Sequence, residues 1–347
     1  MAVLTPTDIS DLVAGTLRDL GRMKFQQIAQ NLVGYEVFPK WFKRDKVQFD
    51  DGIGIQRTLM NRLSGSARHT GYLDSDVANI TDVIDQLQVP WIHAETSWAF
   101  IYQETLMNRG RSLIFNVIKP RRTAAMLDLV EELEEKAWSA PSVDNRTDPY
   151  GIPYYVVKNS VTGFNGGAPS GHTLVANVSL TRSPTFKNYT AQYATISKPD
   201  AIKKLRKAHR ACNFRSPLPG EDHDYGGSLN QYRLYVNEVT ISDIEDVGES
   251  QNENLGRDIA PYGDNMAELA FRGHPIRYIP QLDADTQNPI FGIDHSTFYP
   301  VCLKGDYLRE TGPERAPTQR NVMQVFVDLT YNYLCLDRRR NWVLATA

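Results

Sequence analysis

The sequence ends in MQVFVDLTYNYLCLDRRRNWVLAT, from Met323 to Thr346, where apolar and aromatic residues recur at every second position. Side chains two residues apart lie on the same face of a β-strand, so this alternation predicts one strand from Met323 to Cys335. At about 3.3 Å per residue the strand is roughly 40 Å long, beyond the usual length of about 5–6 residues. The segment DRRRN, residues 337–341, then lets WVLAT turn away or fold back as a C-terminal hairpin.

Three consecutive arginines, Arg338, Arg339 and Arg340, follow this strand. Like charges at the end of a sheet repel one another unless carboxylates or phosphates bind them. We expect acidic side chains of a neighbouring subunit as the first partner of these arginines, and nucleic acid as the second.

The first 45 residues combine a helix with an aromatic segment. Apolar residues recur at helical spacing between Asp8 and Val33, which predicts an amphipathic helix. The next stretch, GYEVFPKWFKRDK, shows neither the helical nor the strand period. We therefore expect an extended arm whose aromatic side chains contact a neighbouring subunit. These side chains are Phe38, Trp41 and Phe42.

A long antiparallel hairpin is expected from residue 46 to residue 103. Its arms are KVQFDDGIGIQRTLMNRL and VIDQLQVPWIHAETSWAFIY, and Pro90 marks a change of phase typical of a bulge or a sheet edge. The stretch between them, SGSARHTGYLDSDVANITD, is rich in Gly, Ser and Asp, which favours a loop projecting from the body of the protein.

The clearest helix runs from Pro120 to Trp138. Proline suits the first helical position, and the apolar side chains form one stripe. Its members are Met126, Leu129, Val130, Leu133 and Ala137. The glutamates are expected largely outside this stripe. They are Glu131, Glu132, Glu134 and Glu135. From residue 146 to 321 strands and helices mix without a βαβ repeat, so the predicted fold class is α+β.

The composition is that of a globular chain, with 41% hydrophobic and 23% charged residues. No apolar run approaches the roughly 20 residues that span a membrane, and the start lacks a secretory signal, so we expect folding in a cytoplasm. The net charge of −3 gives no overall basic signature for nucleic acid. Cys212, Cys302 and Cys335 are far apart and are expected to be buried free thiols.

Common catalytic and nucleotide-binding motifs are absent from the sequence, so we expect no enzyme, no cofactor and no metal. Three alternatives remain open. Glu221 to Asp224 offer hard-metal ligands, Asp294 and His295 an acid/base pair, and the helix from Lys203 to Arg210 a phosphate-binding face. A solvated loop, a structural histidine and a solvated or intersubunit helix face are the favoured explanations of the three.

In the order of its parts the sequence resembles a major capsid protein of a tailed bacteriophage, with the HK-ninety-seven-like fold. The closing phrase YNYLCLDRRRNWVL is similar to the aromatic, then arginine-rich, then apolar endings of such proteins. The resemblance implies five segments. They are an N-terminal arm (1–45), an extended loop (46–103), a peripheral domain with a spine helix (104–145), a mainly axial domain (146–321) and a long peripheral strand with a C-terminal hairpin (322–347).

The resemblance implies a structural protein that self-assembles as pentamers and hexamers into an icosahedral head around double-stranded DNA. It would be found in the virion, after synthesis in the cytoplasm of a bacterial host. The implied partners are copies of itself, a portal, a decoration protein and packaged DNA contacted non-specifically, with no membrane. Another self-assembling virion protein, a portal or a tube protein, is the first alternative, and a metal-dependent enzyme is the second.

Two departures from the family pattern refine these expectations. The arm begins near residue 8, without the built-in scaffolding domain of some members, so we expect a separate scaffolding protein or none. The sequence has no lysine between Lys46 and Lys119, so the loop tip lacks the nucleophile that some members join to an asparagine of a neighbour. The resemblance therefore implies a non-covalent shell.

Overall fold

A computed structural model describes residues 34–44, 46–72, 80–101, 103, 118–213, 232–249 and 269–346. The helix expected from Asp8 to Val33 lies outside these residues. None of the helices they form is both long and apolar enough to cross a membrane. The chain divides into two compact units. Unit 1 holds Met1–Leu32, His93–Leu133 and Gly305–Thr330, and unit 2 holds Val33–Ile92, Glu134–Lys304 and Tyr331–Ala347.

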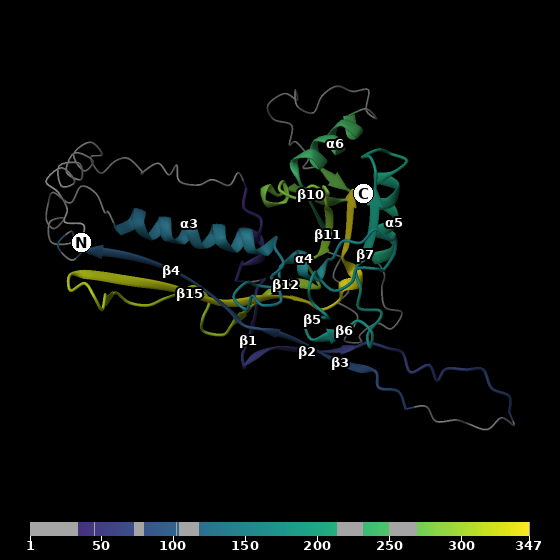
Figure 1. The fold of residues 1–347 in the computed structure, drawn as a ribbon, viewed down its shortest axis with the longest axis horizontal. Helices are drawn as coiled ribbons and strands as arrows, with labels where there is room; N and C mark the ends of the chain where they lie inside the picture. The colour runs from purple at the N-terminus through teal and green to yellow at the C-terminus, as the bar shows by residue number, and fades with distance from the viewer. Residues whose placement is uncertain are drawn as a thin grey trace. The chain divides into compact units, whose positions relative to one another are not determined.

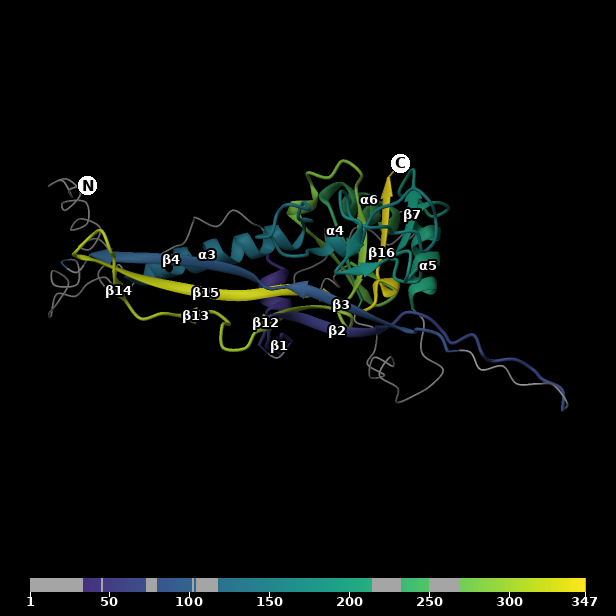
Figure 2. The ribbon, with the colours of Figure 1, turned by 60° about the horizontal axis from the view of Figure 1, so that its bottom comes forward.

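Unit 1 is built on the long strand β15 (Val322–Cys335), which continues into unit 2 from Tyr331. Its 14 residues confirm the strand predicted from the alternating pattern. In unit 1, β15 pairs with β4 (Ile92–Ile101) and with two short strands, β13 (Arg309–Glu310) and β14 (Glu314–Arg315). The pairing of β4 with β15 gives unit 1 a ribbon of two long strands (Figure 2).

Helix α3 (Ile118–Ala137) lies along β4, and the hydroxyl of Thr96 donates a hydrogen bond of 3.2 Å to the carbonyl of Ala125 (Figure 1). The predicted apolar stripe is buried at Leu129, Val130 and Leu133. Burying a leucine or valine side chain contributes about 1.5–3 kcal/mol, so this stripe holds the helix in place.

Unit 2 contains a six-stranded mixed sheet in the order β7-β16-β11-β8-β10-β9. The strands are β7 (Tyr189–Tyr193), β8 (Tyr232–Val236), β9 (Ala270–Phe271), β10 (His274–Tyr278), β11 (Ile290–Asp294) and β16 (Trp342–Thr346). Helices α5 (Ala201–Cys212) and α6 (Glu238–Glu249) pack against it through Leu205, Ala208 and Ile244, which share one core with Leu234 and Trp342. The mixture of helices and sheets confirms the α+β class.

Smaller elements complete unit 2. β12 (Phe298–Leu303) pairs in parallel with β1 (Gln48–Asp50) and antiparallel with the last residues of β15. The others are a π-helix (Val37–Trp41), α4 (Ile152–Tyr155), the paired strands β5 (Leu174–Val175) and β6 (Val178–Ser179), and two 3₁₀ turns (Pro280–Leu282 and Arg338–Arg340).

The predicted hairpin is confirmed for β2 (Gly54–Met60) and β3 (Ile84–Pro90), which pair antiparallel along their whole length. The second arm ends at Pro90, where the sequence changes phase, and β4 pairs with β15 instead of continuing the hairpin. Polar contacts hold the base of the hairpin, because Asn61 Nδ2 donates to Ser183 Oγ at 3.1 Å and the Gln88 N–H donates to the Ala176 carbonyl at 3.0 Å. Beyond Met60 the chain runs on past the paired strands (Figure 2).

The expectation that the last residues fold back on β15 as a hairpin is wrong. After β15 the chain turns through Arg338–Arg340, and β16 joins β7 in parallel and β11 antiparallel. The join to β11 depends on Gly292, because a Cβ atom there would lie 2.0 Å from Cε2 of Trp342. The C-terminal strand is thus a central strand of the unit 2 sheet, with no partner in β15.

Candidate subunit-interaction surfaces

The arginine turn is folded into unit 2 rather than presented to a neighbour. Arg338 is fully buried and donates four hydrogen bonds within the chain. The acceptors are the carbonyls of Tyr155 (2.6 Å), Phe186 (3.0 Å) and Gly167 (2.8 Å) and the Asn188 Oδ1 atom (3.2 Å). Burial lowers the pKa of Arg338 to about 10. The guanidinium therefore clamps three separate backbone segments onto the turn.

The other two arginines have acidic partners in the same chain. Arg340 is buried and pairs with the buried Asp294, with 3.3 Å between Nη1 and Oδ2. Arg339 pairs with Asp337 at 2.9 Å, and its side chain is 45% exposed. The expectation that neighbouring subunits neutralise this run is thus wrong for Arg338 and Arg340, because the fold itself supplies their acceptors. Of the three, Arg339 is the one with a surface that a partner can contact.

Phe38, Trp41 and Phe42 were expected to be exposed on an extended arm. This expectation is wrong for Trp41 and Phe42. Trp41 and Phe42 are 4% and 2% exposed, and residues Val37–Trp41 form a π-helix. The indole of Trp41 donates to the hydroxyl of Tyr235 at 3.3 Å, and the ring of Phe42 packs edge-on against Tyr331. Phe38 is partly exposed and stacks on Phe42.

Glu134 holds the start of the π-helix in place. From the sequence it was expected to lie largely outside the buried stripe of its helix. Its carboxylate is fully buried and accepts the backbone N–H groups of Glu36 (3.0 Å) and Val37 (2.9 Å). Burial raises the pKa of Glu134 against these two hydrogen bonds, which lower it. The signal was present, because Glu134 follows Val130 by four positions and so shares its helix face.

The suspected acid/base pair does not form. Asp294 accepts hydrogen bonds from the backbone N–H and the hydroxyl of Ser296 and pairs with Arg340. His295 instead lies 2.7 Å, through Nε2, from the hydroxyl of Tyr235. A cavity of about 230 Å³ adjoins His295, with Lys40, Lys46 and Arg233 among its lining residues. The geometry favours a structural role for both Asp294 and His295.

Acid should destabilise the folded chain through His295. Burial, followed by the positive charge of Arg233, lowers the pKa of His295 to about 3. The unfolded chain therefore binds more protons between pH 6.5 and 3, so stability is complete above pH 6.5 and falls as the pH decreases. We expect urea unfolding between pH 7 and 4 to show a loss from this group of up to about 1.4 kcal/mol per pH unit.

The variant His295→Gln should make that pH dependence shallower, because it removes the imidazole whose pKa the fold lowers. Equal slopes for the wild type and His295→Gln would contradict the assignment.

The β2–β3 hairpin, with the chain that adjoins and connects its strands, carries half of the exposed large apolar side chains of the described residues. Twelve large apolar side chains are exposed among all the described residues, and six of these twelve lie between residues 53 and 84. They are Ile53, Met60, Leu63, Tyr72, Ile80 and Ile84. Hydrophobic residues scattered singly on a surface are normal, but a concentration on one projecting hairpin is typical of an interaction surface.

Helix α5 presents a basic face. Leu205, Ala208 and Cys212 are buried, whereas Lys203, Arg206, Lys207 and Arg210 are exposed. Lys204 pairs with Asp200. This is the pattern of a solvated or intersubunit helix face. The possible metal ligands Glu221 to Asp224 lie outside the described residues. The three cysteines are buried and free, as predicted.

A second group of metal-ligating side chains, which sequence reasoning did not single out, lies in unit 1. His93, Glu95 and Asp328 bring a ring nitrogen and two carboxylates within 4.8 Å of one another.

Comparison with known proteins identifies the fold. Neither a protein-family model nor a curated protein matches the sequence. Among solved structures, the capsid asymmetric unit of cyanophage A-1(L) has a TM-score of 0.64 at 11% identity, covering 93% of this chain and 95% of that chain. The capsid of Myoviridae phage XM1 has a TM-score of 0.52 at 11% identity, covering 95% and 98%.

The capsid of a native GTA particle has a TM-score of 0.51 at 13% identity, with 94% and 96% of the two chains covered. The chain therefore has the fold of the major capsid proteins of tailed phages. This confirms the fold that the order of the sequence segments suggested.

Proposed function

We propose that this protein is the major capsid protein of a tailed bacteriophage, which assembles as pentamers and hexamers into an icosahedral head around double-stranded DNA. The observation that carries the proposal is the match to a phage capsid subunit over almost the whole length of both chains. That extent favours a capsid subunit over the portal or tube protein considered from the sequence. The head would contain this chain as a structural component without catalysis.

The exposed apolar hairpin supports self-association. A monomer leaves Ile53, Met60 and Ile84 in water, and copies of the chain can bury these side chains in an assembly. Phe38 and Arg339 are the two residues of the predicted interface set that remain proposals for direct contacts with a neighbour. The scaffolding protein, portal, decoration protein and packaged DNA remain proposed partners, as does synthesis in the host cytoplasm before incorporation into the virion.

Electron microscopy tests the assembly directly. We expect the chain, expressed alone or with a scaffolding protein, to form closed polyhedral shells or rings of five and six subunits in negative stain. A stable monomer under both conditions would refute self-assembly into a shell.

Polar substitutions on the hairpin should separate assembly from folding. We expect the double variant Ile53→Ser/Ile84→Ser to change the free energy of unfolding of the subunit by about 0.5 kcal/mol or less, because both side chains are exposed. The yield of particles, measured by sedimentation, should fall at least about tenfold as apolar contact area is lost.

The matched control is Thr58→Ser, an exposed polar position on β2, which should leave the particle yield unchanged. Normal particle yield from the double variant would show that the hairpin contributes little to assembly.

A further inference from the structure

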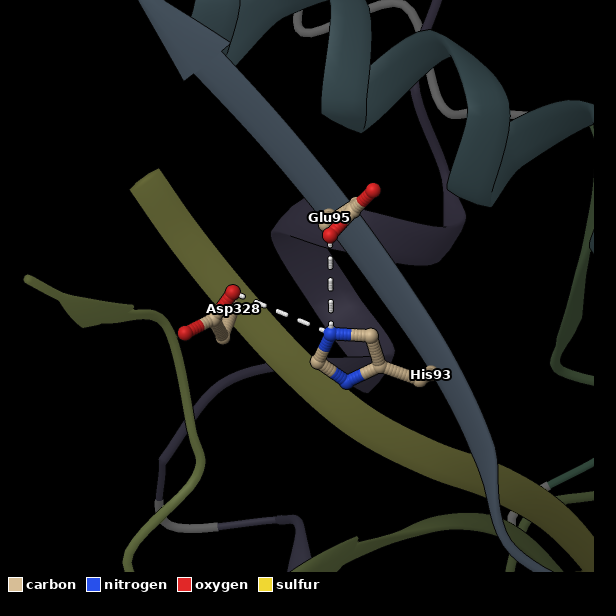
Figure 3. Close-up of side chains that lie close together, drawn as sticks. All are labelled: His93, Glu95 and Asp328. Atoms are coloured by element: carbon tan, nitrogen blue, oxygen red, sulfur yellow. Dashed lines mark ion pairs between the residues drawn. The ribbon is translucent and has the colours of Figure 1, made fainter. Parts of the chain in front are cut away.

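Three side chains on two neighbouring strands of unit 1 point toward one another (Figure 3). His93 and Glu95 are two residues apart on β4 and so share one face, and Asp328 lies on β15. The Nε2 atom of His93 is 3.9 Å from Oε2 of Glu95 and 3.7 Å from Oδ1 of Asp328. These atoms are close enough to share one ion after small side-chain rotations, since metal–ligand distances are about 2.0–2.2 Å for Zn²⁺.

Hydrogen bonds on the other side of the imidazole determine which nitrogen faces the carboxylates. The hydroxyl of Thr330 donates its proton to Oδ2 of Asp306. Its oxygen lies 3.0 Å from Nδ1 of His93 and is left to act as an acceptor. A neutral His93 therefore carries its proton on Nδ1, which leaves the Nε2 lone pair directed at Glu95 and Asp328. A lone pair facing two carboxylates is unfavourable unless a proton or a metal ion lies between them, and of the two a metal ion can bind Nε2 and both carboxylates together.

The remaining charged groups orient the site and leave it negative. Arg309 Nη2 lies 3.0 Å from Oδ2 of Asp328 and 3.1 Å from Oδ1 of Asp306. This arrangement holds Asp328 with its other oxygen, Oδ1, toward His93. The carboxylates of Glu95, Asp306 and Asp328 and the guanidinium of Arg309 together have a formal charge of −2. One divalent cation neutralises this charge.

We propose that His93, Glu95 and Asp328 bind one divalent transition-metal ion of the Zn²⁺ class. The ligands are Nε2, one oxygen of Glu95 and Oδ1 of Asp328. Asp306, Thr330 and Nδ1 of His93 are linked by hydrogen bonds. Metal-bound histidines commonly have such an outer hydrogen-bonded support. An imidazole with two carboxylates favours Zn²⁺ over Mg²⁺ and Ca²⁺, which prefer oxygen ligands alone.

The exposure of the site agrees with its being loaded from solution. The side chains of His93 and Glu95 are 48% and 70% exposed, so an ion can enter and keep water at its remaining positions. The bound ion joins β4 to β15 by bonds that add to their backbone pairing. Metal binding therefore stabilises unit 1, whether or not the chain assembles.

The test uses the full-length, tag-free subunit, stripped with a chelator and titrated with Zn²⁺ alone. We expect calorimetry to show one Zn²⁺ per chain and thermal unfolding to shift upward with Zn²⁺ concentration, with a much weaker response to Mg²⁺. Glu95→Gln and His93→Gln should abolish this binding event. Thr330→Val, which keeps the side-chain shape and removes the hydroxyl, should weaken it by about 10–100-fold.

His172→Gln is the matched control, since it removes a histidine that lies in unit 2. It should bind Zn²⁺ as the wild type does. Glu95 is exposed, so we expect Glu95→Gln to fold as the wild type does. This variant therefore tests the proposal even if another variant fails to fold. Unchanged Zn²⁺ binding by Glu95→Gln and His93→Gln, or no saturable binding by the wild type, would overturn the proposal.

Discussion

Replacing Arg338 by alanine is expected to lower the free energy of unfolding of the unassembled subunit by about 3–5 kcal/mol. The substitution leaves two buried carbonyls, one part-buried carbonyl and one buried amide oxygen without the guanidinium that they bind, and it opens a space the size of the side chain. Hydrogen bonds from a charged donor are stronger than neutral ones, so the loss exceeds that of an ordinary buried polar contact. Urea unfolding monitored by circular dichroism gives the value.

Arg339→Ala is the matched control, one position away. Its side chain is 45% exposed and pairs with Asp337, so we expect a loss of about 1 kcal/mol or less. If the arginine turn served mainly to contact neighbours, Arg338→Ala would impair assembly without affecting subunit unfolding. A near-normal unfolding curve for Arg338→Ala would therefore restore the interpretation based on sequence alone.

The sequence could not reveal the environment of Arg338, and the reason is physical. Its acceptors are mostly backbone carbonyls, and every residue has one, so no residue type marks Tyr155, Phe186 or Gly167 as a partner. Each lies more than 150 positions from Arg338 along the chain. A run of three arginines indicates that counter-groups exist, but it does not say whether they belong to the same chain.

Local periodicity, by contrast, correctly predicted three elements of the fold. The length of β15, the β2–β3 pair and the buried stripe of α3 follow from spacing within one segment, which depends on neighbours two to four residues away. The proximity of His93 to Asp328 could not be predicted in the same way. It depends on the pairing of β4 with β15, and no pattern within one segment shows which strands pair. Its local signal was limited to His93 and Glu95 at alternate positions of a strand that also contains the polar residues Thr96 and Ser97.

The first 45 residues show the same limit for tertiary structure. They were expected to include an extended arm that contacts a neighbouring subunit, yet Val37, Trp41 and Phe42 are core residues of unit 2. A truncation at residue 45 would remove these side chains and unfold the subunit, whereas one at residue 33 would keep them. The first truncation therefore cannot test the contribution of an arm to assembly.

Replacing Trp41 by alanine should lower the free energy of unfolding by about 3–5 kcal/mol, the range found when a large buried aromatic side chain is removed. Its indole is 4% exposed and lies among five rings at centroid distances of 5.0–6.0 Å. These rings belong to Trp138, Tyr235, His295, Phe298 and Tyr333. The loss includes the hydrogen bond from the indole to Tyr235, whose hydroxyl also lies against His295. Equilibrium unfolding in urea measures the change.

Phe38→Ala provides the comparison within the same segment. Phe38 is partly exposed and stacks on Phe42 at a centroid distance of 6.4 Å, so its loss should cost about 1 kcal/mol or less in the subunit. If Phe38 contacts a neighbour in the proposed shell, this variant should reduce particle yield more than subunit stability, and Trp41→Ala should do the reverse. Two aromatic residues three positions apart would then have different roles, one in assembly and one in the core. Equal effects of both variants on subunit unfolding would contradict that division, because it follows from their difference in burial.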